Sequence, residues 1–219
     1  MTTVQERVAQ AADSLKVFPL PSAVLFPHSA IPLHIFEPRY RDLIRDALEG
    51  DKVMALAQLE PGWESRYGAR PLMQPLMCAG LIVWHDELPD GRYNILLQGV
   101  CRARLLSELP PDRLYREARV ELLPDPTYHG PEEEQLRQAV FELVGRVPPS
   151  FSEGLVPAVA RANGGALADV VAAAIIPEPE RRQALLAELD VRQRLQEVTD
   201  EVGELIARLQ PLRPAGPLN

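Results

Sequence analysis

The chain has 219 residues, of which 46% are hydrophobic and 25% charged, and its formal net charge is −8. This composition supports one large or two small domains with a hydrophobic core, and it argues against intrinsic disorder. Both halves are acidic, with −3 over residues 1–125 and −5 over residues 126–219, so neither offers the clustered basic surface that nucleic-acid binding usually requires. No apolar run approaches the ~18 residues of a membrane span, and residues 1–16 lack a signal-peptide core, so we expect a cytoplasmic protein.

The first half of the chain is predicted to be rich in β-strands. Apolar residues at helical spacing between Val4 and Leu15 indicate a short N-terminal helix, and the apolar runs that follow are broken by prolines, which favour sheet edges and bends. A helix is predicted to begin at Pro38 and to end at Gly50, because proline suits the first helical position and glycine the C-terminal cap. A buried strand is expected over residues 53–59.

Two longer strands, over residues 76–84 and 93–106, are predicted to form a hairpin around the turn at residues 88–91. If Leu88 pairs with Gly91, the register places Cys78 opposite Cys101, within reach of a disulfide bond. A reducing cytosol instead favours two free cysteines, and a single bulge would change the register. A last β run is expected over residues 115–123.

The segment at residues 124–126, Pro-Asp-Pro, is the predicted boundary between a β-rich domain over residues 1–125 and a helical domain over residues 126–210. After it the apolar period changes from two to about 3.6. The last helix carries a heptad pattern that is short for an independent coiled coil, so we favour packing within a helical bundle. The proline-rich tail over residues 211–219 is expected to be disordered. The expected helices cover residues 136–147, 152–161, 166–176, 178–188 and 191–209.

Sequence motifs of enzymes and of cofactor sites are missing. There is no phosphate-binding loop, no dinucleotide fingerprint and no nucleophile elbow. Two cysteines and four scattered histidines do not form a metal-binding pattern, and we interpret the cluster of His85, Asp86 and Glu87 as a solvated shoulder of the hairpin. We therefore expect no catalytic residues, no metal and no cofactor.

The candidate binding residues lie in the stretch over residues 63–77, most of which is a loop bracketed by prolines over residues 61–75. Trp63, Tyr67, Met73 and Met77 combine aromatic anchors with adaptable methionines, which are residue types that bind varied apolar partners. The loop has a second interpretation, as a lid folded over the β core. The sequence favours neither interpretation over the other.

The chain carries a series of short motifs between residues 15 and 209: Val17-Phe18-Pro19-Leu20, Val24-Leu25-Phe26-Pro27, residues 32–41, Gly80, Asp90-Gly91-Arg92, Gly99-Val100-x-Arg102, Leu167-Ala168-Asp169, Gln183-Ala184-Leu185-Leu186, Asp190-Val191 and Arg194-Leu195. Together these segments resemble the Lon N-terminal domain family. The resemblance implies an α+β fold, in which a PUA-like β pseudo-barrel is followed by an α-helical bundle. One departure is His28, since the family usually has a small residue at this turn. Phe18, Phe26, Ile35 and Phe36 are expected to fill the barrel core.

In the Lon protease this domain recognises substrates and precedes ATPase and protease modules, whose motifs this sequence lacks. The resemblance therefore implies a non-enzymatic, stand-alone bacterial module that binds exposed apolar or unfolded polypeptide segments, as a proteolysis adaptor. Its expected partners are protein or peptide segments, with no nucleic acid and no membrane, and the module itself is expected to be a monomer or a weak homo-oligomer. The alternative is a PUA-like RNA-binding module, against which the acidic balance counts.

Overall fold

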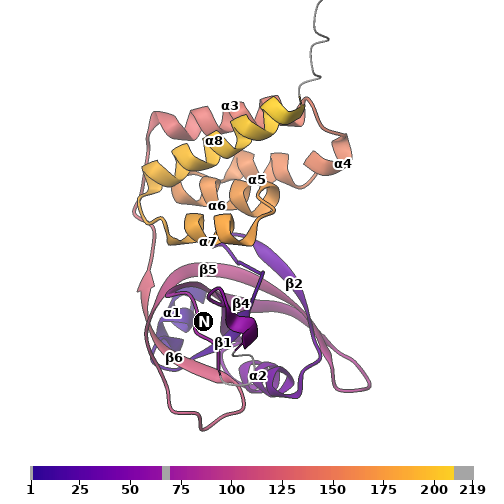
Figure 1. Ribbon diagram of the computed structural model, residues 1–219, viewed down its shortest axis with the longest axis vertical. Coiled ribbons are helices and arrows are strands. Elements are labelled where there is room, and N and C mark those ends of the chain that lie inside the picture. Colours follow the sequence, from indigo (N-terminus) through magenta and orange to yellow (C-terminus); the bar gives the residue numbers. More distant parts are fainter. Residues whose placement is uncertain (1, 66–69, 210–219) are drawn as a thin grey trace, which may run out of the picture. The chain divides into compact units, whose positions relative to one another are not determined.

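The computed structural model describes residues 2–65 and 70–209, which form two compact units (Figure 1). The barrel unit is Met1–Pro126 together with Pro177–Leu189, and the helical unit is Thr127–Ile176 together with Asp190–Asn219. The chain first passes from the barrel unit to the helical unit after Pro126, one residue later than the predicted boundary after residue 125. The prediction of two continuous domains needs a correction, because residues 177–189 belong to the barrel unit. The tail predicted to be disordered, 211–219, lies outside the described residues.

The sheet of the barrel unit closes on itself through its longest strand. The strand order is β2-β5-β4-β3-β1-β6, and β6 also pairs with the C-terminal half of β5. Only β1 and β3 pair in parallel; the other pairs in the described sheet are antiparallel. The pseudo-barrel and the predicted strands are thus confirmed. The bounds are β1 Leu15–Leu20, β2 Ala30–Ile35, β3 Val53–Gln58, β4 Leu76–Glu87, β5 Tyr93–Glu108 and β6 Arg116–Leu123.

The described part of the barrel unit contains three helices: α1 (Val4–Ala11), α2 (Pro38–Glu49) and α7 (Pro179–Ala187). A capping box between Thr3 and Glu6 begins α1, because the Thr3 hydroxyl accepts from the Glu6 N–H and the Glu6 carboxylate accepts from the Thr3 N–H. As predicted, α2 begins at Pro38 and ends before Gly50. Its apolar face is buried on the barrel, where Tyr40 meets Phe18 with ring centroids 4.4 Å apart.

Helix α7 is fastened to the barrel by two side chains that donate to main-chain carbonyls. Arg102 Nε on β5 donates to the Leu186 carbonyl at 2.9 Å, and Gln183 Nε2 on α7 donates to the Leu76 carbonyl at 2.8 Å. Arg102 is only 1% exposed, and its Nη1 lies 3.5 Å from Asp125 Oδ2. These contacts explain why α7, which lies between the two segments of the helical unit in sequence, belongs to the barrel unit.

The helical unit is a bundle in which α8 packs on α3 and α6. Arg194 of α8 and Asp169 of α6 are fully buried, with Arg194 Nε 3.3 Å from Asp169 Oδ1. The apolar pattern of α8 is buried within this bundle, but its stripe ends at Ile206 instead of Leu205, because a straight helix repeats every 3.6 residues and drifts from a heptad. The bounds are α3 Pro131–Val144, α4 Pro149–Ser152, α5 Leu155–Arg161, α6 Gly164–Ile175 and α8 Val191–Leu209.

The turn after β1 is held against β5 at a glycine. A Cβ on Gly99 would lie 2.1 Å from the Phe26 carbonyl oxygen, so no other residue fits without moving the backbone. The His28 N–H donates to the Gly99 carbonyl at 3.0 Å, and His28 itself has a φ of 63°. The departure at His28 therefore leaves the turn intact, since histidine is among the residues enriched in left-handed conformations.

The predicted hairpin register around the cysteines is wrong. Leu88 N–H donates to the Arg92 carbonyl, so three residues form the turn and Gly91 takes a φ of 76°. Two irregularities in the pairing of β4 with β5 then leave Cys78 opposite Arg102. Cys78 is buried, Cys101 is partly buried, and both are free thiols.

We predict that Arg102→Met lowers the free energy of unfolding by about 3 kcal/mol, because the Leu186 carbonyl loses its donor and Asp125 its buried counter-ion. Urea denaturation followed by circular dichroism measures the change. Arg104→Met is the matched control on the same strand: its ion pair with Glu121 is solvent-exposed, so its loss should cost under about 1 kcal/mol. Equal effects of the two substitutions would contradict a central role for Arg102.

We also predict that the two cysteines stay reduced and that Cys101 reacts slowly. Burial raises the pKa of the Cys101 thiol, so its thiolate is scarce at neutral pH. The rate of alkylation by iodoacetamide can be measured by mass spectrometry at a series of pH values. For Cys101 this rate should go on rising to a higher pH than it does for the thiol of glutathione. Recovery of a Cys78–Cys101 disulfide from cells would refute the prediction.

Candidate functional site

The structure separates the four residues predicted to bind partners. Met77 is 0% and Met73 is 5% exposed, and both belong to the hydrophobic core of the barrel unit. Met77 points inward from β4, and Met73 is fixed by a β-bridge to Leu59. Their predicted role as contact residues needs correction, because neither presents surface to a partner in this conformation. Tyr67 lies outside the described residues.

Trp63 is partly buried and lies beside a hollow of about 410 Å³, which we call the Trp63 hollow. It packs against the same core cluster that contains Met73. Gly62, with a φ of 83°, turns the chain before Trp63, and the Ser65 hydroxyl donates to the Gly62 carbonyl at 2.9 Å. The described residues that line the hollow are Pro21, Gln58, Leu59, Pro61, Gly62, Trp63, Glu64, Gln74, Glu180 and Gln183.

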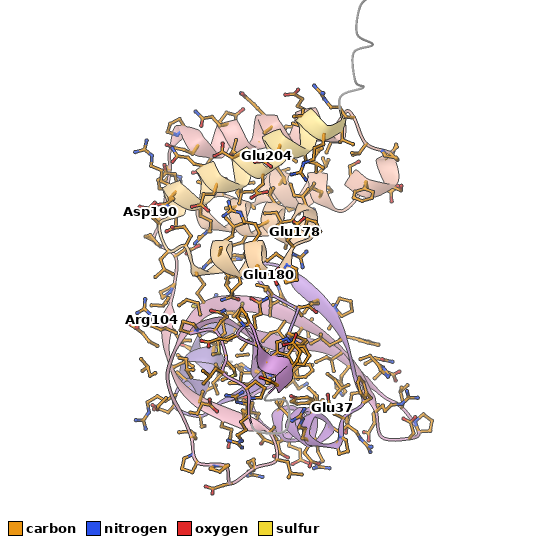
Figure 2. All side chains as sticks on the ribbon, viewed as in Figure 1. Glu37, Arg104, Glu178, Glu180, Asp190 and Glu204 are labelled. Carbon is orange, nitrogen blue, oxygen red and sulfur yellow. The ribbon has the colours of Figure 1, made fainter. Side chains whose placement is uncertain are left out.

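The lining of the Trp63 hollow is more polar than the sequence suggested. Glu64 follows Trp63 in the loop, whereas Glu180 comes from the first turn of α7, where Figure 2 labels it. Gln58 and Gln183, both buried, are also lining residues of the hollow. The contribution of α7 could not be read from sequence, because about 115 residues separate it from Trp63.

A second feature is an exposed aromatic surface on the outside of the sheet. Pro32 of β2 pairs with Leu96 of β5, and Leu96 pairs with Trp84 of β4, so these three residues form a row across three strands. Phe36 is 61% and Trp84 is 54% exposed. The Phe36 ring stacks beside that of His34, with centroids 6.2 Å apart. We call Pro32, His34, Phe36, Trp84 and Leu96 the aromatic face.

The exposure of Phe36 corrects its predicted place in the core. Side chains alternate between the two sides of a strand, and Ile35, at 1% exposed, takes the inward position at the end of β2. Phe36 therefore points outward. Within the described sheet β2 pairs with β5 alone, so the aromatic face extends to an open strand edge.

The described residues offer no metal site: nowhere in 2–65 or 70–209 do three or more histidine, cysteine or carboxylate side chains gather to hold an ion. His85, Asp86 and Glu87 are exposed at the end of β4. Of the described helices, none has the length and apolar character needed to cross a membrane.

Comparison with known proteins gives a consistent result. The family model described as the ATP-dependent protease La (LON) substrate-binding domain matches residues 14–203. The Lon protease of Desulfosudis oleivorans is 30% identical over 203 residues, which are 90% of this chain and 25% of that protein. Lon protease of Paraburkholderia phytofirmans is 29% identical, over 92% of this chain and 25% of its own length. The chain thus spans about a quarter of the length of the curated relatives it matches.

Two solved structures share the fold. A Lon N-terminal domain protein from Xanthomonas campestris has a TM-score of 0.64 at 24% identity, covering 85% of this chain and 97% of its own. The N-terminal domain of the Mycobacterium avium complex Lon protease has a TM-score of 0.69 at 15% identity, covering 88% of this chain and 99% of its own. At these identities the likeness concerns the fold.

We predict that Phe36→Ala changes the free energy of unfolding by less than about 1 kcal/mol, as expected for an exposed side chain. Phe26→Ala is the control, because Phe26 is 0% exposed and its removal should cost roughly 3–5 kcal/mol. Urea denaturation of both variants gives the two values. A loss at Phe36 as large as that at Phe26 would show that the ring is buried in solution.

Proposed function

Because the chain belongs to the family of Lon substrate-binding domains, we propose that it binds exposed apolar segments of unfolded polypeptides, without enzymatic activity of its own, and that the aromatic face is the main contact surface. The family match covers substrate recognition only. It includes neither the ATPase nor the protease part of the longer relatives, of which this chain spans about a quarter.

The observation that carries the proposal is the exposure of Phe36 and Trp84 on one outer sheet face. Exposing a large aromatic side chain to water costs free energy. A contiguous group of such side chains on a folded domain therefore marks an interaction surface. The barrel does not use these rings for its own core. Their free energy of burial is therefore available to a partner, at about 1.5–3 kcal/mol for each large side chain that becomes fully covered.

The open edge of β2 suits an extended polypeptide. An edge strand offers backbone groups to a partner chain, while outward side chains of the same strand contact the side chains of that partner. Pro32 interrupts the edge, since it has no N–H to donate, and it limits continuous pairing. The aromatic side chains therefore supply most of the contact, which fits recognition of apolar composition rather than of one sequence.

Proteins fit this surface better than RNA. Exposed aromatic rings stack on bases, but binding to RNA also requires cations along the backbone of the nucleic acid. Arg92, next to the aromatic face, is paired with Asp90 at 2.7 Å, and Asp86 and Glu87 add negative charge at the end of β4. A domain of this kind is suited to hold a client polypeptide for a protease, which is the role of an adaptor.

We predict that the double substitution Phe36→Ala, Trp84→Ala weakens binding of an unfolded polypeptide at least tenfold, because both rings are central anchors. Reduced, carboxymethylated α-lactalbumin labelled with fluorescein is a suitable probe, with fluorescence anisotropy as the measurement. The variant should stay folded, since both rings are exposed.

Leu114→Ala is the matched control: Leu114 is 70% exposed in the same unit but does not belong to the aromatic face, and its loss should leave the dissociation constant within twofold. Unchanged binding by the double variant would reject the aromatic face as the contact surface. If Phe151→Ala, in the helical unit, abolished binding instead, the contact surface would have to be sought there.

A further inference from the structure

We propose that a pocket beside helix α1 holds an apolar side chain of the polypeptide that the domain binds, and that this side chain lies four residues along the extended polypeptide from one that contacts the aromatic face. The inference rests on the proposed function for the identity of the ligand, and it adds a second contact point to the aromatic face.

The pocket, which we call the α1 pocket, has a volume of about 340 Å³, and all its lining residues belong to the barrel unit. Val8 of α1 is a buried part of this lining. The apolar lining residues that a ligand can reach are Val100 of β5 and Leu122, Leu123 and Pro124 at the end of β6, none of which is buried. A pocket of this volume with mostly apolar walls suits an organic side chain.

A β-bulge turns two consecutive residues of β5 toward the pocket. Ala79 pairs with Cys101 and Gly80 pairs with Gly99, so Val100 is the extra residue of the bulge. Consecutive side chains of a regular strand point to opposite sides, yet Val100 and Cys101 both line the pocket. The Cys101 thiol can therefore report whether the pocket is occupied.

The pocket offers a ligand little net charge. Arg102 and Asp125 both line it, but Arg102 Nη1 lies 3.5 Å from Asp125 Oδ2, so their charges offset each other. Burial raises the pKa of the Cys101 thiol, which is therefore neutral at pH 7. A charged side chain would lose water in the pocket without gaining a free counter-ion, whereas an apolar side chain loses nothing of this kind.

An exposed track joins the pocket to the aromatic face. Side chains two residues apart share one side of a strand, so Gln98 of β5 lies on the same side as Leu96. In β2, Ala30 pairs with Gln98 just as Pro32 pairs with Leu96. Gln98 and Ala30 are both exposed, so an extended polypeptide on the aromatic face can continue over them.

The α1 pocket lies on this same side of the sheet. Gln98 also pairs with Leu81 of β4, so these two side chains share a side. Leu81 and Val100 pack against the core cluster that contains Val8 of α1. Val100 follows Leu96 by four residues, a distance of about 13 Å along an extended strand. A bound polypeptide can therefore place two side chains, four residues apart on one of its sides, on the aromatic face and in the pocket.

The test uses the full chain and four labelled 15-residue peptides of one sequence rich in serine and threonine. They carry two leucines four residues apart, two leucines three residues apart, one leucine alone, or one leucine with an aspartate four residues from it. By fluorescence anisotropy the first peptide should bind about tenfold more tightly than the single-leucine peptide. The second should stay within about threefold of it, because its second leucine points to the opposite side. The aspartate peptide should bind no more tightly than the single-leucine peptide.

Leu123→Asn makes one wall of the pocket polar. It should reduce the tenfold advantage of the first peptide to less than about threefold and leave the single-leucine peptide unaffected. Leu106→Asn is the matched control, since Leu106 is 56% exposed on β5 and does not line the pocket. Circular dichroism checks that both variants are folded.

Alkylation of Cys101 by iodoacetamide tests the pocket in the wild-type protein, independently of any substitution. At equal occupancy, the first peptide should slow alkylation at least about fivefold and the aspartate peptide less than about twofold, as measured by mass spectrometry. A first peptide that binds more tightly but leaves alkylation of Cys101 unchanged would have its second leucine elsewhere, and it would overturn the proposal.

Carboxymethylated α-lactalbumin, measured in parallel, separates the two levels of the argument. If it binds but the first peptide has no advantage over the single-leucine peptide, the α1 pocket is rejected and the proposed function stands. If neither the protein probe nor any peptide binds, both fail. Alkylation of Cys101 that slows as the protein concentration rises, with no peptide present, would identify a second copy of the chain as the occupant and overturn the assignment to a bound polypeptide.

Discussion

The hydrogen bond and ion pair of the buried Arg102 guanidinium are the interactions on which the docking of α7, and with it the Trp63 hollow, depends. A charge at 1% exposure is costly unless its hydrogen bonds are satisfied, and Arg102 finds its partners in the Leu186 carbonyl and the Asp125 carboxylate. These partners lie on opposite sides of the first segment of the helical unit, Thr127–Ile176, in sequence. Satisfying one side chain on β5 therefore holds α7 on the barrel, and it also fixes the chain where it leaves the barrel unit.

The return of α7 creates the Trp63 hollow. Without α7 the loop around Trp63 would face solvent on that side, and the hollow would lose Glu180 and Gln183. The amide of Gln183 stabilises this arrangement, because its Nε2 donates to the Leu76 carbonyl and so holds α7 on β4.

The aromatic face has a different physical origin. Closing a five-strand barrel uses β5 twice, with its C-terminal half paired to β6 and its N-terminal half paired to β2. Strand β2 is left at an edge of the described sheet, and its outward side chains, Pro32 and His34, are exposed. Phe36 and Trp84 are therefore exposed without any loss of core packing, which explains how a stable domain retains an apolar surface for partners.

The sequence alone determined much of the fold, because many of its signals are local. Pro38 and Gly50 mark both ends of α2, the change of apolar period separates strands from helices, and the signature around Phe18 and Phe26 identifies the barrel. It also selected Trp63, which does lie at a hollow.

The tertiary structure decided the features that depend on contacts between distant residues. The burial of Met73 and Met77, the outward position of Phe36 and the pairing of Cys78 with Arg102 each depend on strand register, which one bulge can change. The membership of α7 in the barrel unit depends on Arg102 reaching a carbonyl 84 residues away. The spacing of apolar residues in the sequence predicts which residues share one face of a strand or helix. Whether that face packs against the core or is exposed to solvent depends on how the strands pair and where the helices dock.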